Sequence, residues 1–310
     1  MKAFAITARN AQPALQDLPQ PEPAAGEVLV EVEAASVNGF DLSVAGGYVF
    51  DMLPHEFPVV LGRDLVGTVT ALGDGVDIVA VGDRVAGVIP GVALSARNGS
   101  FAETVALPAE AVTRVPAGVD APSAAVIGLA GVAAHDALEA LNVQSGETVL
   151  ISGATGGVGS IATQLAVAAG ATVIATARPG QEEEYVRGLG ASHVVDYSGD
   201  ITAAVHALAP QGVDKALHAA GDAAALGKTL RAGATVASTR GASAEELGRD
   251  DVTFTPIMAA ATGDKLARLL DHVAGGTLRV NVEATLPLER AHEALAAFAD
   301  GTLGKVLITR

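Results

Sequence analysis

Along the first 116 residues, short apolar stretches alternate with turns rich in glycine and proline. Between residues 27 and 37, Val28, Val30 and Val32 alternate with a face that carries Glu31 and Glu33. A period of two residues predicts β-strands with one apolar and one largely polar face. We place strands at residues 2–8, 27–37, 64–72, 84–88 and 101–107. The N-terminal part is therefore predicted to be a small β-barrel or sandwich.

From residue 121 onward, helical and extended segments alternate. Residues 121–141 are apolar on all sides, as in a buried helix. Alternation of strands and helices predicts a parallel sheet covered by helices on both faces. Two amphipathic helices, at residues 265–273 and 289–298, and a strand at 306–309 follow this region. The predicted strands are 148–152, 172–176, 193–196, 215–219 and 235–238, and the predicted helices are 157–169, 182–189, 201–209 and 222–230.

The most informative motif lies at residues 149–159, where an aliphatic strand leads through a glycine-rich turn into a helix. Glycine lets the backbone approach a pyrophosphate, and the first N–H groups of the helix favour negative charge. The glycine spacing differs from plain G-x-G-x-x-G, but strand, turn, helix and second strand have the lengths of a dinucleotide-binding unit. We therefore predict a dinucleotide site rather than a mere tight connection. The predicted contacts are Ala154, Thr155, Gly156, Gly157 and Val158.

The end of the second strand of this unit indicates which nicotinamide cofactor binds. NAD-binding folds usually carry an acidic residue there for the adenosine ribose, whereas this strand ends in Thr176, with Arg178 just beyond it. A guanidinium and a hydroxyl suit a 2′-phosphate, which favours NADPH. An acidic run at residues 182–184 lies close by. We interpret it as a solvated first helical turn, in which acidic side chains favour the helix dipole.

Composition narrows the possible chemistry further. The chain contains no cysteine, which excludes thiol nucleophiles, iron–sulfur clusters and zinc sites built on thiolates. Its 19 basic and 35 acidic residues give a formal net charge of −16, and such a surface repels nucleic acid and anionic lipid. The N-terminus shows no long apolar leader segment. We expect a cytoplasmic protein without a nucleic-acid or membrane partner.

Several further motifs follow one another along the chain. They are VEVEAASVNGFD (30–41), FPVVLGRDLVG (57–67), VGDRV (81–85), GSFAE (99–103), GATGGVG (153–159) and GKVLI (304–308). In this order they resemble the medium-chain dehydrogenase/reductase superfamily, specifically its zinc-independent branch of quinone oxidoreductases and zeta-crystallin-like proteins. The likeness extends over the whole chain.

The resemblance implies an α/β protein with two domains. A GroES-like β-barrel domain would comprise residues 1–118 and 260–310, and a Rossmann doubly wound parallel sheet would be inserted at residues 119–259. The active site would lie in the cleft between them. The resemblance also implies a homodimer formed through an edge of the Rossmann sheet.

The resemblance also bears on metal binding and catalysis. Zinc-dependent members bind zinc with Cys and His, whereas residues 36–41 contain no Cys and Arg63 stands where a ligand His would be. Because no set of nitrogen and sulfur ligands remains, we expect metal-free chemistry. Asn38, Asp41 and Tyr48 match the active-site loop of the family. Asn38 and Tyr48 would donate hydrogen bonds to the substrate oxygen and Asp41 would orient the loop, although capping of a local turn is an equal interpretation for Asn38 and Asp41.

Three more residues are assigned to the cofactor by resemblance. Tyr197 matches a tyrosine near the adenosine phosphate, and Lys305 lies in a motif on the cofactor side. His218 ends a predicted strand where relatives often carry an acid, so it is expected to face the cofactor ribose.

A nicotinamide cofactor supplies hydride, so the protein has chiefly to position an acceptor and stabilise a developing oxyanion. Hydride addition to a conjugated carbonyl suits a metal-free site. The leading prediction is an NADPH-dependent reductase of a quinone or an α,β-unsaturated carbonyl. The alternatives are an enoyl-thioester reductase of a biosynthetic pathway and a non-catalytic NADPH-binding protein. Ala133, where the family often has threonine, slightly favours the last.

Overall fold

The computed structural model describes residues Met1–Arg310 and divides into two compact units. Unit 1 comprises Met1–Leu129, Ala261–Gly276 and Asn281–Arg310, and unit 2 comprises Ala130–Ala260 and Thr277–Val280. The boundaries expected from the sequence lay between residues 118 and 119 and between residues 259 and 260. The compact units change after residues 129 and 260, with a short return to unit 2 at residues 277–280.

Unit 1 is built on antiparallel strands except for the parallel pair β15 and β16, and β3 (Glu27–Ser36) is its central strand. β3 pairs with β5, β7 and β16, within a seven-stranded sheet of order β15-β16-β3-β5-β6-β8 in which β7 pairs only with β3. A three-stranded sheet has the order β2-β1-β4. The strands are β1 (Lys2–Ile6), β2 (Ala14–Asp17), β4 (Val59–Val60), β5 (Asp64–Leu72), β6 (Arg84–Val88), β7 (Thr104–Pro108), β8 (Val112–Arg114), β15 (Val282–Pro287) and β16 (Lys305–Thr309).

The core of unit 1 contains the valines that the sequence pattern singled out. Val28, Val30 and Val32 are all buried in one apolar cluster together with Phe101 and Leu107. The alternation of valines in β3 therefore identifies the face of the strand that packs into the core. The helices of this unit are α1 (Gly39–Ala45), α2 (Ala121–Val126), α8 (Gly263–Ala274) and α9 (Ala291–Ala299), with single turns η1 (Ala109–Ala111) and η3 (Leu288–Arg290).

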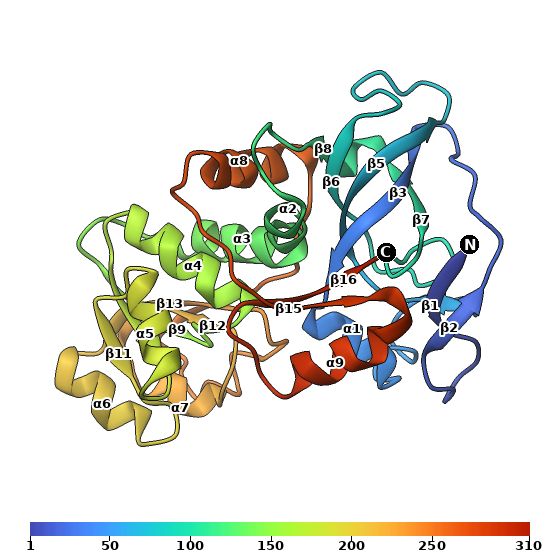
Figure 1. The fold of residues 1–310 in the computed structure, drawn as a ribbon. Helices are drawn as coiled ribbons and strands as arrows, with labels where there is room; N and C mark the ends of the chain where they lie inside the picture. Colours follow the sequence, from blue (N-terminus) through green and yellow to red (C-terminus); the bar gives the residue numbers. More distant parts are fainter. The chain divides into compact units, whose positions relative to one another are not determined.

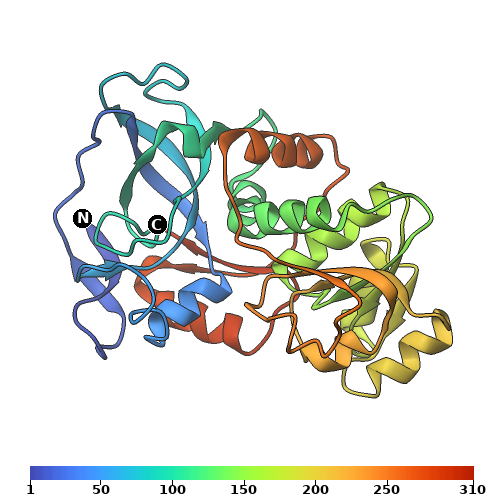
Figure 2. The same cartoon turned by 180° about the vertical axis from the view of Figure 1, so that it is seen from behind.

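Unit 2 contains a six-stranded sheet in which every neighbouring pair is parallel. The strand order β11-β10-β9-β12-β13-β14 reverses direction between β9 and β12, which is the arrangement of a doubly wound dinucleotide-binding fold. Helices α3 and α4 lie on one side of this sheet and α6 and α7 on the other (Figures 1 and 2). The strands are β9 (Thr148–Ser152), β10 (Thr172–Thr176), β11 (His193–Val195), β12 (Val213–His218), β13 (Leu230–Ser238) and β14 (Thr253–Pro256), and the helices are α3 (Val132–Leu141), α4 (Gly157–Ala168), α5 (Gln181–Gly188), α6 (Ile201–Leu208) and α7 (Ala223–Gly227).

The predicted fold class is confirmed, since the GroES-like part and the doubly wound parallel sheet are both present. The edge strands of the parallel sheet are β11 and β14. The homodimer expected through such an edge stays a prediction.

One predicted helix, residues 121–141, is interrupted in the structure. After α2 the chain forms a wider turn at Ile127–Gly131, in which Gly128 has non-helical dihedral angles (φ −48°, ψ −116°), and α3 follows. Gly128 lies close against a distant part of the sequence, because a Cβ at position 128 would overlap the side chain of Asp64. The Leu129 N–H donates to the Asp64 carboxylate at 3.2 Å, so the break also supplies that carboxylate with a donor.

The same stretch is the one helical segment long and apolar enough to cross a membrane by length and composition. Of its most apolar window, 67% is buried inside the structure. A buried core helix passes such a test as readily as a membrane span.

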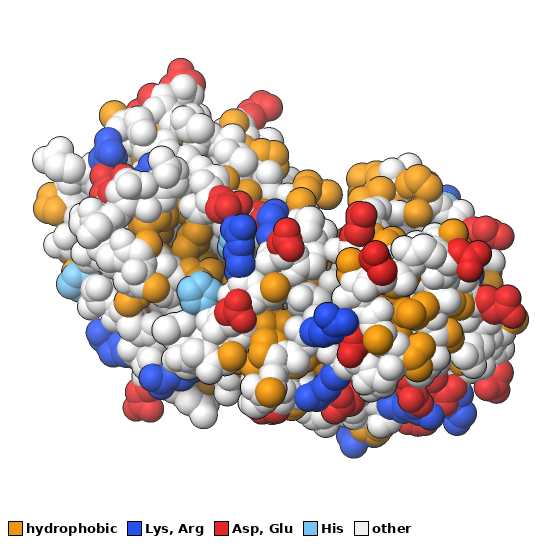
Figure 3. Space-filling model, turned by 90° about the horizontal axis from the view of Figure 1, so that it is seen from above, with side chains coloured by type: hydrophobic (Ala, Val, Ile, Leu, Met, Phe, Trp, Pro, Cys, Tyr) orange, Lys and Arg blue, Asp and Glu red, His pale blue; other side chains and the backbone are white.

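Charged side chains lie on the surface of both units. Figure 3 shows acidic side chains scattered over the face it presents, several of them beside lysine or arginine side chains. No continuous patch of one sign covers that face.

Candidate functional site

The glycine-rich turn of unit 2 connects β9 to α4 at the point where the strand order reverses. Gly153 has a φ of +85°, a conformation that favours glycine. At Gly159, a Cβ would overlap the Gly153 carbonyl oxygen, so this glycine lets α4 start directly against the turn. Gly156 is the N-cap of α4, and no side chain caps the helix there.

The space in front of Gly156 is open. A Cβ built there meets no atom nearer than the Gly153 carbonyl oxygen at 3.7 Å. A twelve-residue helix thus presents an uncapped N-terminus to an open space, at the carboxyl ends of parallel strands. These features suit the pyrophosphate of a dinucleotide, because the helix N–H groups and dipole favour an anion. The residues of this turn therefore fit the nicotinamide dinucleotide that the sequence predicts.

Thr176, at the end of β10, contacts the glycine turn. Its side chain is buried, and its hydroxyl accepts a hydrogen bond from the Gly153 N–H at 2.9 Å and lies 3.4 Å from the Ile151 carbonyl oxygen. The Thr176 hydroxyl is therefore used in a hydrogen bond that stabilises the glycine turn. A direct contact between Thr176 and a 2′-phosphate stays a prediction.

Arg178 and Tyr197, both assigned to the adenosine end of the cofactor, lie together on unit 2. The Arg178 guanidinium carbon is 5.7 Å from the centre of the Tyr197 ring. Glu182 joins them: its carboxylate accepts hydrogen bonds from the Arg178 backbone N–H at 2.8 Å, from Arg178 Nε at 2.8 Å and from the Tyr197 hydroxyl at 3.2 Å. We call these three residues the Arg178 cluster.

The acidic run at residues 182–184 is therefore not simply solvated, and this part of the sequence interpretation is wrong for Glu182. Its side chain is only 13% exposed, whereas that of Arg178 is 62% exposed. Burial alone would raise the pKa of the Glu182 carboxyl, but the hydrogen bonds from Arg178 bring that pKa below its usual range. Glu182 is thus an ionised acid that holds Arg178, the residue predicted to bind the 2′-phosphate.

His218 ends β12, next to Ser152 of β9 in the sheet register. It is buried, and both ring nitrogens have partners within unit 2. Nε2 lies 3.1 Å from the Gly221 carbonyl oxygen and Nδ1 lies 3.1 Å from the Ser238 hydroxyl. A carbonyl only accepts, so we assign a ring proton to Nε2 from the hydrogen-bond partners. The ring is held in place, and its predicted contact with the cofactor ribose stays a prediction.

A cavity of about 390 Å³ opens beside His218, beyond the carboxyl ends of β12 and β13. Its lining contains one cation, Arg240, two acids, Asp222 and Glu246, and small residues of the two loops. Arg240 was not predicted from the sequence, although its place just after a predicted strand, residues 235–238, was a usable signal. Ligands of open α/β sheets bind beyond these strand ends. The cavity and the glycine turn both lie at this carboxyl edge of the sheet.

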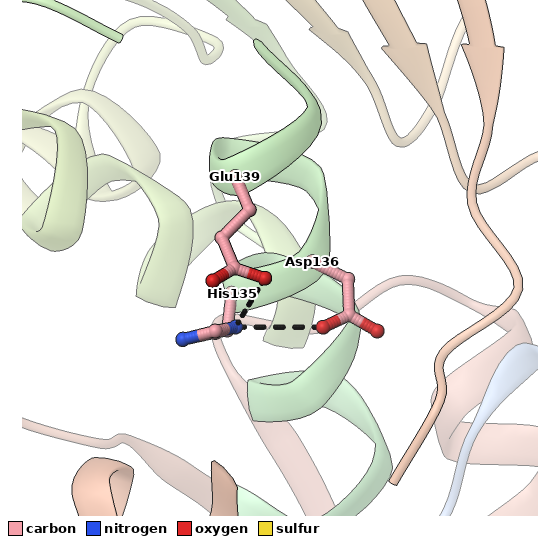
Figure 4. Close-up of side chains that lie close together, drawn as sticks. All are labelled: His135, Asp136 and Glu139. Carbon is pink, nitrogen blue, oxygen red and sulfur yellow. Dashed lines mark hydrogen bonds and ion pairs between the residues drawn. The ribbon is translucent and has the colours of Figure 1, made fainter. Parts of the chain in front are cut away.

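One cluster of potential metal ligands lies on α3. His135 Nδ1 is 3.4 Å from an Asp136 oxygen and 3.6 Å from a Glu139 oxygen. Figure 4 shows both carboxylates directed at the same ring nitrogen. His135 and Asp136 are neighbours in one turn of α3 and Glu139 lies one turn later, and Glu139 is exposed. The two carboxylates orient this histidine, and we assign no metal to it.

In unit 1, the predicted catalytic residues Asn38 and Asp41 belong to a buried polar cluster of Ser36, Asn38, Asp41, Asp64 and Lys305. The Lys305 ammonium donates to the Val37 carbonyl at 2.6 Å and to Asn38 Oδ1 at 2.5 Å. The Asn38 amide in turn donates to the Ser36 carbonyl and to Asp64 Oδ2, both at 3.0 Å. Every polar atom of the Asn38 side chain is therefore used inside the chain.

The two carboxylates of this buried polar cluster also accept hydrogen bonds from the chain itself. Asp41 accepts from the backbone N–H groups of Asn38 at 2.8 Å and Gly62 at 3.1 Å. Asp64 accepts from the Ser36 backbone and hydroxyl, each at 2.7 Å. Asp41 thus bridges the start of α1 to the segment before β5, which agrees with the predicted loop-orienting role and equally with a turn cap. The predicted donation from Asn38 to the substrate and the predicted cofactor contact of Lys305 stay predictions.

Tyr48 follows α1 and is 75% exposed. Its ring lies along the backbone of Gly46, where a Cβ would come within 2.5 Å of a ring carbon. Gly46 therefore leaves room for the ring in this turn. The Tyr48 hydroxyl makes no hydrogen bond to the rest of the chain, so it is free for the donor role that the sequence predicts.

Burial raises the pKa of the Asp41 carboxyl from its usual 3.8 to about 7, against the opposing hydrogen bond from Asn38. The raised pKa means that the folded chain favours the protonated acid. That contribution to stability is complete below about pH 4 and is lost as the pH rises towards about 7. We expect the melting temperature of Asp41→Asn, relative to the parent, to increase between about pH 4 and pH 8. Calorimetry at several pH values measures it.

Asp51→Asn is the control for this experiment, because Asp51 is exposed and contacts Arg9 at the surface. Its melting temperature relative to the parent should show no matching rise. If Asp41→Asn and the parent keep a constant difference in melting temperature across this range, the carboxyl does not titrate as described.

Arg63, the residue that stands in place of a zinc-ligand histidine, is buried beside α1. Its exposed fraction is only 6%. One nitrogen, Nη2, donates to the Gly91 carbonyl, and the guanidinium carbon lies 5.2 Å from the centre of the Phe40 ring. The other terminal nitrogen, Nη1, is buried and has no hydrogen-bond partner. No pattern in the sequence signalled this unpaired group.

Unit 2 has a doubly wound parallel sheet of the dinucleotide-binding type, and unit 1 has a β domain. Two family models match the chain, one described as an alcohol dehydrogenase GroES-like domain at residues 24–117 and one as a zinc-binding dehydrogenase at residues 157–239. The chloroplast envelope quinone oxidoreductase homolog of Arabidopsis thaliana is 27% identical over 94% of this chain and 92% of its own length. A mycobacterial protein solved in complex with NADPH is 30% identical, with complete coverage of both chains and a TM-score of 0.86.

Part of the chain also resembles a much larger enzyme. The mycocerosic acid synthase-like polyketide synthase of Mycobacterium tuberculosis is 39% identical over 56% of this chain, which corresponds to 8% of the larger protein.

The chain belongs to the medium-chain dehydrogenase/reductase superfamily, and quinone oxidoreductases are among its relatives, as the sequence motifs indicated. It is an oxidoreductase of this superfamily.

Proposed function

We propose that this oxidoreductase uses NADPH to reduce a quinone or an α,β-unsaturated carbonyl without a metal. The observation that carries the proposal is the uncapped N-terminus of α4 behind the open space at Gly156, which suits a dinucleotide. A bound nicotinamide cofactor would supply hydride. Ala154 to Val158 would bind its pyrophosphate, as the sequence predicts.

The choice of NADPH over NADH is supported by the strand end and by one relative. β10 ends in a buried threonine without an acid for the adenosine ribose, and Arg178 lies beside it with an exposed side chain. The mycobacterial relative described above was solved with NADPH. In this chain a 2′-phosphate would have to compete with Glu182 for the guanidinium.

Metal-free chemistry is supported by the donors of unit 1. A catalytic zinc site needs three protein ligands and an open position. The chain has no cysteine, and Arg63, a cation, stands at the predicted ligand position. The carboxylates of Asp41 and Asp64 are occupied by N–H and O–H donors of the chain itself. The quinone oxidoreductase homolog supports a conjugated carbonyl as the acceptor.

The second candidate function is reduction of an enoyl thioester, and the resemblance to part of a polyketide synthase favours it. Stopped-flow oxidation of NADPH by panels of quinones, enones and enoyl thioesters separates the candidates. We expect oxidation that depends on a quinone or an enone. Oxidation with enoyl thioesters alone would support the second candidate, and tight NADPH binding without oxidation by any acceptor would leave a non-catalytic binding protein.

The Arg178 cluster allows a test of the cofactor assignment by itself. Arg178→Ala should weaken NADPH binding about tenfold or more, because a charge-assisted hydrogen bond contributes about 1.5–3 kcal/mol. Glu182→Gln should strengthen NADPH binding by a similar factor, because the amide no longer competes as an anion for the guanidinium. NADH affinity should change little in both variants. Calorimetric titration with both cofactors measures this.

Glu183→Gln is the matched control, because Glu183 lies on the same helix and pairs with Arg187 instead. It removes the same charge without touching the Arg178 cluster. Weaker NADPH binding in Glu182→Gln would show that Glu182 positions Arg178 for the phosphate. Equal affinity of the parent for NADPH and NADH would overturn the NADPH assignment.

A further inference from the structure

A short segment, Thr277–Val280, belongs to unit 2, although the chain on either side of it belongs to unit 1. We call these four residues the strap. α8 ends shortly before the strap and β15 begins shortly after it, and the strap itself forms neither helix nor strand. Its backbone groups therefore need partners from another part of the chain.

Gln164 of α4 supplies such partners through its side-chain amide. The Arg279 N–H donates to Gln164 Oε1 at 2.8 Å, and Gln164 Nε2 donates to the Arg279 carbonyl at 2.8 Å. One side chain thus exchanges two hydrogen bonds with one residue of the strap, as paired residues of antiparallel strands do. Gln164 is buried, and so is Leu278 of the strap, at 2% exposure. Gln164 therefore fixes the strap on α4, and Leu278 anchors it in the protein interior.

The same amide is connected to the glycine-rich turn at the start of α4. Gln164 Nε2 also donates to the Ser160 carbonyl at 3.1 Å. The Ser160 N–H in turn donates to the carbonyl of Gly156, the N-cap of α4, at 2.9 Å. A continuous series of hydrogen bonds therefore joins the strap to the helix end that suits a pyrophosphate.

The two ends of the strap differ in how firmly they are held. Before it, Gly276 has a φ of +70°, and a Cβ built there meets no atom within 4 Å. After it, the Asn281 carbonyl accepts from the Lys305 N–H at 3.0 Å, and the Asn281 side-chain amide donates to the Leu303 carbonyl. A segment between a glycine and a fixed residue can leave its docking position without global unfolding.

We propose that the strap has a docked and an open state, that Gln164 is its latch, and that a bound dinucleotide favours the docked state. The last part rests on the proposed function, because it requires a cofactor at the glycine turn. An anion on the N–H groups of this turn would order the first turn of α4, and with it the Ser160 carbonyl that holds the Gln164 amide. The coupling is reciprocal, so an open strap would weaken cofactor binding.

Limited digestion of the full chain with trypsin tests the latch without any cofactor. The side chain of Arg279 is exposed, but its backbone is tied to Gln164, so cleavage after Arg279 follows the population of the open state. Gln164→Met keeps the size of the side chain and removes both hydrogen bonds to the strap. We expect cleavage after Arg279 to become about tenfold faster or more. Mass spectrometry identifies the fragment that begins at Val280.

Cleavage after Lys215, within β12, reports global unfolding and should stay far slower than cleavage after Arg279 in both proteins. Gln144→Met is the matched control, because Gln144 also donates from its amide to a backbone carbonyl of unit 2, that of Asn142, at 3.0 Å. It should leave cleavage after Arg279 unchanged. Leu278→Ala removes the buried anchor of the strap itself and should speed the same cleavage, and it replaces Gln164→Met if that variant does not fold.

Cleavage after Arg279 that is as slow in Gln164→Met and Leu278→Ala as in the parent would overturn the latch. Cleavage after Arg279 and Lys215 at equal rates would show that the strap opens only when the whole protein unfolds, which also overturns it.

A second digestion with saturating NADPH tests the coupling to the cofactor. We expect NADPH to slow cleavage after Arg279 about fivefold or more in the parent, and to have little effect in Gln164→Met. Calorimetric titration shows whether NADPH binds. NADPH that binds to the parent without slowing this cleavage would overturn the coupling. A parent that does not bind NADPH would contradict the proposed function, whereas the digestion without cofactor still decides whether Gln164 is the latch.

Discussion

Replacing Gly156 by alanine is expected to lower the affinity for NADPH about tenfold or more while the protein stays folded. The new methyl group would occupy the open space in front of α4, where the pyrophosphate would have to approach the helix N–H groups. Its backbone, with a φ of −79° and a ψ of 176°, suits alanine without strain. Calorimetric titration gives the affinity, and thermal unfolding without cofactor shows that the fold is intact.

Gly159→Ala is the contrasting variant of the same turn. Its methyl group would overlap the Gly153 carbonyl oxygen and come within 2.7 Å of the Ala154 Cα, so α4 has to move away from the turn. We expect a loss of about 1–3 kcal/mol or more in the free energy of unfolding, together with loss of cofactor binding. A Gly156→Ala protein that binds NADPH as the parent does would show that the cofactor does not use this turn.

Replacing Lys305 by methionine is expected to have the largest effect on stability, about 3–5 kcal/mol, because it removes one partner from a set of buried charges. The ammonium is buried within hydrogen-bonding distance of Val37 and Asn38, and its charge offsets those of Asp41 and Asp64. Without it, two carboxylates share the buried polar cluster. Urea unfolding of the parent and the variant measures the loss.

The loss should depend on pH, because burial raises the pKa of the Asp41 carboxyl to about 7. When Asp41 is protonated, at about pH 5, one of the two negative charges is absent and Lys305→Met should cost less than at about pH 8. Lys228→Met, an exposed lysine of unit 2, is the control and should be nearly neutral. An equally small loss in Lys305→Met at both pH values would mean that the buried polar cluster does not need its cation.

The fold was accessible from the sequence because its signals are local. The alternation of valines in β3 marks a strand, and the glycine turn after β9 marks a strand followed by a helix. Short strands gave no such signal: β2 has only four residues and β4 only two, and both exist because β1 lies between them. Arg178 and Tyr197, which the sequence assigns to the same end of the cofactor, lie close together in unit 2, and their cofactor contacts stay predictions.

The finer chemistry of the site depends on contacts between distant parts of the chain. Lys305 lies 267 residues after Asn38, and its motif does not show that its ammonium is buried against that amide. In the sequence, Glu182 is an ordinary acid of a first helical turn, and only the fold brings Arg178 and Tyr197 to its carboxylate. The missing partner of Arg63 Nη1 is a property of the folded interior. Residue type and spacing describe what a side chain can do, while tertiary contacts decide which of its atoms remain free.

The contact between Gly128 and Asp64 also limits how this chain can evolve. A side chain at position 128 fits only if position 64 becomes glycine or the backbone moves, because a Cβ at position 128 would overlap the Cβ of Asp64 itself. Removing the Asp64 carboxylate in turn leaves the donors of Ser36, Asn38 and Leu129 without their acceptor. Neither position can accept a substitution first without loss. The two are therefore expected to be epistatic, and drift at either one is blocked until several residues of the buried polar cluster change together.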